Sequence, residues 1–249
     1  MIRLSLVIAL LSSTLTAQQL SFIACPVVRD TKTVPCWLAE YEGELYYLGV
    51  QEDGVREDID AQWFPPQQSH EVLVEGTVQP GPRVCGGIPL SPLFTSVMPE
   101  LTRSCNTVLP AKDEIPAPAA TRPHATHPLE EPPSPPYIAR DFTVFFDFDN
   151  DQMPARSTSV IASVAAWAAT VHATSLQITA VRGAALLSDG RVLNESDLIA
   201  TRRANKVARL LKGIGVPASS LSLRIEETPA KPDGIHDPAT RRVGITVQP

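Results

Sequence analysis

Aromatic residues are scarce in this chain of 249 residues, at 6%, although hydrophobic residues make up 43% of it. This composition supplies apolar material for a core, but not for one core spread over the whole length, so we expect two small domains and a tether. An excess of basic residues is also missing, because the net charge is −6. Proteins that coat nucleic acid need a basic surface to displace counterions from phosphates, so nucleic acid is not an expected partner.

Sequence motifs of enzymes and metal sites are missing as well. The chain has no nucleophile elbow, no phosphate loop and no histidine paired by a motif with serine or cysteine. Asp147, Asp149 and Asp151 alternate as at the start of a calcium loop, but Gln152 and Thr158 stand where that loop needs glycine and glutamate. We therefore expect a protein that is not an enzyme, with no cofactor and no metal site, and interpret the three aspartates as a strand end that reaches water.

The first 17 residues have the pattern of an export signal. A basic start at residues 1–3, an apolar run at 4–11 and the small residue Ala17 at a cleavage point match a secretory signal peptide. Two alternatives stay open: an uncleaved anchor, because residues 4–28 carry no charge, and lipidation of Cys25, which ends a sequence that resembles a lipoprotein cleavage box. Each interpretation places the protein in the periplasm or cell envelope, with association to the outer membrane as one option.

All four cysteines lie in the first 105 residues, at Cys25, Cys36, Cys85 and Cys105. An even number in a small, loop-rich region of an exported chain predicts two disulfides rather than reduced core cysteines. Four cysteines allow three pairings. We predict Cys25 with Cys36 and Cys85 with Cys105, because these pairs close short loops.

A proline-rich segment divides the chain. Nine prolines stand between residues 110 and 136, and this composition favours extended chain over a packed core, so residues 110–139 are interpreted as a semi-rigid linker.

Upstream, residues 25–109 show only short strand patterns, at 37–41, 44–49 and 71–78. They predict a small all-β domain that resembles an OB-type barrel. We expect the two halves to fold independently, with few contacts across the linker.

Downstream of the linker, the apolar period changes between that of strands and that of helices. Strand patterns occur at 142–148, 176–181, 221–225 and 243–247, and helical patterns at 161–171 and 200–214. The second helix is expected to stop at Gly213 and Gly215, with Pro217 beyond. This order predicts an α/β sandwich over residues 140–249, with helices on one face of a mixed sheet, and an α+β class for the whole chain.

Three segments of the second half carry a family resemblance. Thr201-Arg202-Arg203-Ala204-Asn205-Lys206-Val207 is similar to an arginine-arginine-alanine helix, residues 237–243 to a closing strand with a double arginine, and residues 142–149 to the opening strand. In this order and spacing they resemble the OmpA C-terminal domain family, the peptidoglycan-associating module of Gram-negative envelope proteins. The resemblance covers about residues 140–248.

The resemblance implies a non-catalytic site for the diaminopimelate of the peptidoglycan peptide stem. In the family an arginine takes a carboxylate bidentately and an aspartate takes the ammonium of the same head group. The arginine corresponds to Arg203, which we interpret as surface-lining. Leu186 stands at the position of the aspartate, in a loop that looks two residues longer. Asp189 is therefore considered as its replacement, with an exposed turn aspartate as the alternative.

Two functions remain open. In the first, the OmpA-like domain tethers the exported protein to peptidoglycan through Arg203, while the β domain meets another envelope protein. In the second, the fold has lost its head-group pocket and serves as an assembly or interaction module, as Leu186 suggests.

Residues 52–60 form an acidic loop that we interpret as a solvated edge. The aromatic pair Trp63-Phe64 is interpreted as a core plug, with an exposed partner-binding knob as the alternative.

Overall fold

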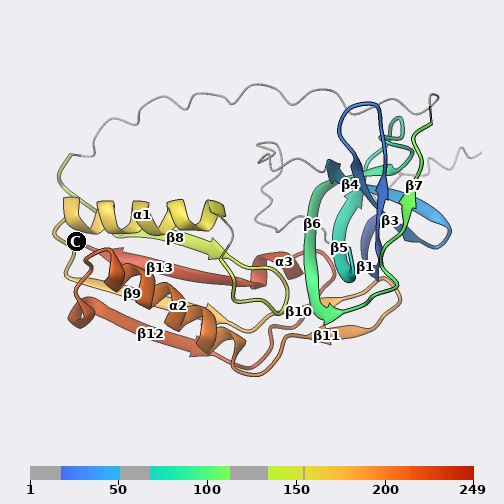
Figure 1. Ribbon diagram of the computed structural model, residues 1–249. Helices are drawn as coiled ribbons and strands as arrows, with labels where there is room; N and C mark the ends of the chain where they lie inside the picture. The colour runs from blue at the N-terminus through green and yellow to red at the C-terminus, as the bar shows by residue number, and fades with distance from the viewer. Residues whose placement is uncertain (1–17, 51–67, 113–133, 154) are drawn as a thin grey trace, which may run out of the picture.

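Figure 1 shows a computed structural model of the chain, in which a β-rich half lies at one end of an α/β half. The structure describes residues 18–50, 68–112, 134–153 and 155–249. The predicted signal peptide, the acidic loop with Trp63-Phe64, and residues 113–133 of the predicted linker lie outside these described residues. Among the described helices, none has the length and apolar character that a membrane crossing requires.

Seven strands form the N-terminal sheet, in the order β1-β5-β6-β4-β3-β2-β7. Their bounds are β1 Gln19–Ala24, β2 Pro26–Arg29, β3 Cys36–Tyr41, β4 Glu44–Val50, β5 His70–Val78, β6 Ile88–Leu101 and β7 Val108–Leu109. Neighbours pair antiparallel except β4 with β6 and β2 with β7. Within the described strands, β1 and β7 end the sheet without pairing to each other. The all-β character is as predicted, whereas the OB-type barrel is not confirmed.

Both disulfides join segments that are far apart in the sequence. Cys25 is bonded to Cys105, 80 residues away, and Cys36 to Cys85, 49 residues away. The prediction of two disulfides is confirmed, but the predicted pairing is wrong. Sheet pairing decides which cysteines meet: Cys36 begins β3 next to β4, and Cys85 precedes β6, which runs along the other edge of β4. Cys25 has no free thiol for the lipid that the alternative interpretation requires.

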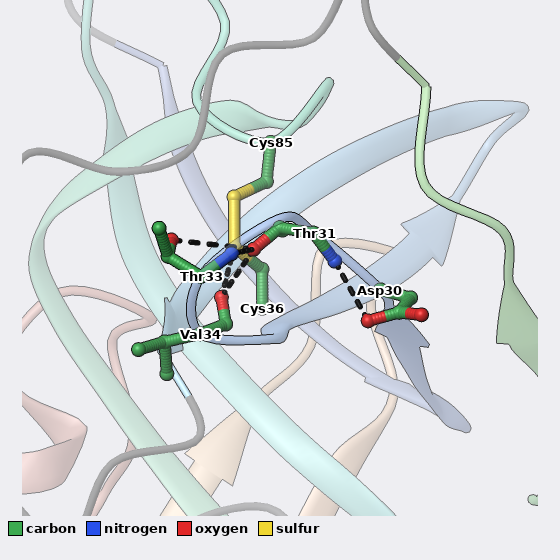
Figure 2. The surroundings of a disulfide bond; sticks show 6 residues. All are labelled: Asp30, Thr31, Thr33, Val34, Cys36 and Cys85. Carbon is green, nitrogen blue, oxygen red and sulfur yellow. Dashed lines mark hydrogen bonds between the residues drawn. A yellow bond between two sulfur atoms is a disulfide. The ribbon is translucent and has the colours of Figure 1, made fainter.

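The Cys36–Cys85 disulfide lies beside the turn that connects β2 to β3 (Figure 2). The Thr31 hydroxyl donates a hydrogen bond to the Val34 carbonyl at 2.9 Å and accepts one from the Thr33 amide at 3.1 Å. These contacts close the turn just before Cys36. The disulfide therefore holds a hydrogen-bonded turn against the segment that leads into β6.

Peptide mapping under non-reducing conditions tests this connectivity. We expect digests of the exported protein to contain Cys25 linked to Cys105 and Cys36 linked to Cys85, because the sheet brings these sulfurs together. Alkylation before reduction should label no cysteine. A peptide that links Cys25 to Cys36 would contradict the structure.

The C-terminal half contains a four-stranded sheet in the order β12-β9-β13-β8. Its elements are β8 Arg140–Phe145, α1 Ala155–Thr170, β9 Ser175–Val181, β10 Ala184–Leu186, β11 Val192–Asn194, α2 Ile199–Gly213, η1 Ala218–Ser220, β12 Leu221–Glu226, α3 Asp237–Thr240 and β13 Arg242–Gln248. β12 is parallel to β9, and β13 is antiparallel to both β9 and β8. Helices α1 and α2 lie on one face of this sheet (Figure 1). The predicted sandwich with a mixed sheet is therefore observed.

Helix α2 begins and ends within one residue of the predicted span. Its apolar residues at three- and four-residue spacing, Ala200, Ala204, Val207 and Leu211, are all fully buried. The helix ends at Gly213, and the Val216 amide donates to the Leu211 carbonyl while Gly215 takes a positive φ of 100°. Only glycine takes this left-handed conformation without a steric penalty, which explains why the helix stops there.

The first predicted strand of this half is shorter than expected, because β8 ends at Phe145. Phe146 and Phe148 leave the ladder, yet both stay buried. The Phe146 amide donates to the Arg241 carbonyl, and the Phe148 amide donates to the Ser96 hydroxyl of β6 at 2.9 Å. The chain therefore turns from its own sheet toward the N-terminal half.

The two halves share a buried junction, which contradicts the expectation that few contacts connect them. Leu73 of β5 packs with Phe148, Ala185 and Leu187 of the C-terminal half in one apolar cluster. At its edge, the Ser188 amide donates to the Ser21 carbonyl at 2.7 Å, and the Ser21 amide donates to the Ser188 hydroxyl at 2.9 Å. The halves are thus in contact, although a proline-rich segment lies between them in the sequence.

Candidate functional site

Arg203, the predicted ligand-binding arginine, points inward from α2 and is fully buried. Its guanidinium donates two hydrogen bonds to the Glu195 carboxylate, at 2.6 and 2.8 Å. It also donates to the carbonyls of Asp147 at 2.8 Å and Asn150 at 2.9 Å. The expectation of a surface-lining arginine is wrong, because each of its three nitrogens already donates to an acceptor within the protein.

Glu195 follows β11 and is also fully buried. Besides Arg203, its carboxylate accepts hydrogen bonds from the backbone amides of Gly183 at 2.6 Å and Asp149 at 2.9 Å. A buried carboxylate is tolerated when it is both paired and hydrogen-bonded in this way. Sequence reasoning missed this residue, because Asn194-Glu195-Ser196 looks like an ordinary polar loop and no local pattern marks a buried acid.

Gly183 lets the end of β9 approach this pair closely. A Cβ atom at this position would lie 2.7 Å from Cγ of Arg241 and 3.0 Å from a carboxylate oxygen of Glu195. Neither side chain has room to move, because both are buried. The glycine is thus required by packing, and it lies between two buried arginines.

Arg241 forms the second buried ion pair, with Glu75 of β5 in the N-terminal half. Both side chains are 2% exposed. Arg241 also donates to the Ser96 hydroxyl at 3.3 Å, and its guanidinium carbon lies 5.6 Å from the centre of the Phe148 ring. One oxygen of Glu75 accepts from Arg241, whereas the other has no hydrogen-bond partner among the described residues. This pair connects the two halves of the protein at the centre of their junction.

Burial raises the pKa of Glu75 above its usual value of 4.5, since loss of solvation outweighs the attraction of Arg241. Between pH 4.5 and the folded pKa, the folded state holds a proton that the unfolded chain releases, and above the folded pKa Glu75 is ionised opposite Arg241. The contribution of Glu75 to stability is therefore fully present below pH 4.5 and is lost as the pH rises through the folded pKa. Relative to Glu75→Gln, the wild type should lose stability above that pH, by at most about 1.4 kcal/mol per pH unit. Urea denaturation at a series of pH values measures this difference. Parallel curves for the two proteins would contradict the prediction.

Asp189, the predicted replacement for the missing aspartate, lies in the turn between β10 and β11. Its carboxylate accepts hydrogen bonds from the backbone amide of Arg191 at 2.9 Å and from the Arg191 side chain at 2.7 Å. These bonds lower the pKa of Asp189, with the backbone amide as the largest cause. The structure pairs Asp189 with Arg191 and Arg203 with Glu195, so it does not bring the two predicted site residues together as a pair.

A different aspartate lies beside Leu186, the residue that the sequence resemblance puts in place of the expected aspartate. The carboxylate of Asp237, at the start of α3, accepts a hydrogen bond from the Leu186 amide at 2.7 Å. It also accepts from the amides of Asp233 at 2.8 Å and Gly234 at 3.0 Å, and it is buried. Asp237 therefore ties two loops together, and its oxygens are occupied by the protein itself.

These contacts define structural ion pairs rather than a reactive centre. Arg203 and Arg241 are each held by a carboxylate, and the one exposed aspartate of the predicted site is neutralised by a neighbour. In the part of the chain that the structure describes, no group of histidine, cysteine, aspartate or glutamate side chains has the arrangement to hold a metal ion. The charged groups of the candidate site are thus occupied by partners within the protein.

Solved structures with a similar fold correspond to less than half of this chain. The OmpA-like domain of FopA1 from Francisella tularensis is 17% identical and covers 44% of this chain and 71% of its own, with a TM-score of 0.35. The periplasmic domain of MotB from Helicobacter pylori is 17% identical, with 45% and 76% coverage and a TM-score of 0.34. A MotB-like protein from Desulfovibrio vulgaris is 15% identical, with 44% and 75% coverage and a TM-score of 0.35. Neither protein-family models nor curated proteins match the sequence.

Proposed function

We propose that this protein is a non-catalytic structural component of the cell envelope whose OmpA-like half serves as an assembly or interaction module. The buried pair of Arg203 and Glu195 carries this proposal, because the arginine that would take a stem carboxylate already holds an internal one. The export pattern and the two disulfides support a location in the periplasm or envelope. The β domain is proposed to contact another envelope protein.

An external carboxylate would have to displace Glu195 from Arg203 and from two backbone amides. Each hydrogen bond to a charged group is worth about 1.5–3 kcal/mol, and a displaced Glu195 would be left buried without partners. The incoming group would restore only the contacts that Glu195 gives up. The exchange therefore brings no net gain, and Leu186 offers nothing for an ammonium group.

Tethering to the diaminopimelate of the peptidoglycan stem is the second candidate. It is supported by the motif of α2, which puts Arg203 at the position of the family's arginine, and by Asp189, which is accessible in its turn. In this case Glu195 would yield to the ligand carboxylate, and Asp189 would leave Arg191 to hold the ammonium.

Co-sedimentation of the exported protein with isolated peptidoglycan sacculi at moderate salt separates the two candidates. As an interaction module, the wild type should stay in the supernatant. As a tether, it should sediment, and Asp189→Ala should lose this binding while the matched control Asp197→Ala keeps it. Both aspartates are exposed, so neither substitution threatens the fold. Sedimentation that depends on Asp189 would overturn the interaction-module proposal.

A further inference from the structure

An apolar groove lies between the C-terminal ends of α1 and α2, with a volume of about 270 Å³. We call it the helix-end groove. Among the described residues that line it none is acidic, and the polar ones are His172 and Ser220. The other lining residues are small or apolar, namely Ala165, Ala168, Ala169, Ala173, Leu176, Ile214, Gly215, Val216 and Pro217.

The last turns of α2, which lead into the lining residues 214–217 of the helix-end groove, carry exposed positive charge. Arg209 and Lys212 on α2 are exposed, and neither forms an ion pair or hydrogen bond with a side chain in the described part of the protein. Helix α2 contains no acidic residue. Beside these cations, Leu210 and Ile214 are 39% and 52% exposed. Exposed apolar side chains between unpaired charges of one sign are typical of a surface that contacts a partner.

We propose that the helix-end groove docks residues 51–67 of a second copy of this chain. This segment contains five acidic residues and one basic residue, followed by Trp63 and Phe64. Its acids match the cations Arg209 and Lys212 in the last turns of α2, and its aromatic side chains match the apolar groove. The complementarity extends to whole halves: residues 25–109 carry 12 acidic and 5 basic residues, whereas residues 140–249 carry 11 acidic and 13 basic residues.

The placement of the groove favours contact between copies over contact within one. The segment begins after β4 and ends before β5, so both of its ends are fixed in the N-terminal half. In Figure 1 the C-terminal ends of α1 and α2 lie at the end of the molecule remote from that half. A second copy can present the segment without this restriction. The contact uses neither Arg203 nor Glu195, so it goes beyond the proposed function and does not depend on it.

Two measurements on the exported full-length protein test this contact. Sedimentation equilibrium over a concentration series should show reversible self-association that weakens as salt is added, because exposed charges are screened. A fluorescein-labelled synthetic peptide of residues 51–67 should bind the protein, as measured by anisotropy. The same peptide with Trp63→Ala and Phe64→Ala should bind at least tenfold more weakly.

Matched variants locate the binding surface. Arg209→Gln combined with Lys212→Gln should lower peptide binding at least tenfold and leave the protein monomeric, and circular dichroism should show an unchanged fold. Lys231→Gln combined with Arg242→Gln removes two exposed charges elsewhere and should change neither measurement. A wild type that is monomeric at all concentrations would overturn the proposal. Self-association or peptide binding that survives loss of Arg209 and Lys212 would overturn it as well.

Discussion

Alanine in place of Arg203 is expected to lower the free energy of unfolding by about 3–5 kcal/mol, because Glu195 would remain buried without its charged partner. The backbone amides of Gly183 and Asp149 still donate to Glu195, but they do not neutralise it. The loss of van der Waals contacts with Phe146 adds to the effect. Urea denaturation, read from the midpoint and slope of the transition, measures the change.

Arg202 provides a matched control for Arg203, since it is the neighbouring arginine on the same helix. It is exposed, and its side chain donates to the Asp197 carbonyl and the Ser196 hydroxyl. Arg202→Ala should therefore cost less than about 1 kcal/mol. The double substitution Arg203→Met with Glu195→Leu should recover most of the stability, because an apolar pair of similar volume often replaces a buried ion pair. Equal effects of Arg202→Ala and Arg203→Ala would contradict the buried pair.

Arg241→Ala should have an effect of similar size, about 3–5 kcal/mol, but at the junction between the halves. Glu75 is buried in β5, two residues after Leu73 of the junction cluster, and at a pH where it is ionised it would then have no counter-charge. We expect the wild type to unfold in a single transition, and the transition of the variant to broaden or to split into two, because the ion pair at the junction is lost. Calorimetry and limited proteolysis detect this change.

The neighbouring Arg242 serves as the control for Arg241. It is exposed at the start of β13, so Arg242→Ala should leave both the midpoint and the shape of the transition unchanged. The combined change of Arg241→Ala with Glu75→Gln should be less damaging than Arg241→Ala alone, since no buried charge remains. Indistinguishable transitions for Arg241→Ala and Arg242→Ala would show that the junction does not depend on this ion pair.

The elements of the C-terminal half follow from the sequence because their patterns are local. The stripe of Ala200, Ala204, Val207 and Leu211 predicts α2 within one residue at each end, and the sheet strands follow from their alternation. The double arginines are also visible in the sequence. Which arginine of each pair is buried is not, because that depends on partners that lie 8 residues away for Arg203 and 166 for Arg241.

The junction between the halves could not be predicted from local patterns either, because the residues that form it are far apart in the sequence. In the strand pattern at 71–78, Val72 and Val74 mark the face toward the core of the N-terminal half, and Glu75 looks like a solvent-facing residue. Leu73 on the same face as Glu75 is the only local hint that this side is covered too. The disulfides show the same limit, since cysteines that meet through sheet pairing are far apart in sequence.

Residues 146–150 contact both Arg203 and Arg241, and this has a consequence for local opening of the protein. The carbonyls of Asp147 and Asn150 accept from Arg203, while the amides of Phe148 and Asp149 donate to Ser96 and Glu195. The Phe148 amide can exchange its hydrogen with solvent only when the halves part, and the Asp149 amide only when Glu195 moves. Exchange at these two neighbouring amides thus distinguishes two fluctuations, separation of the halves and release of the internal carboxylate, in one stretch of backbone.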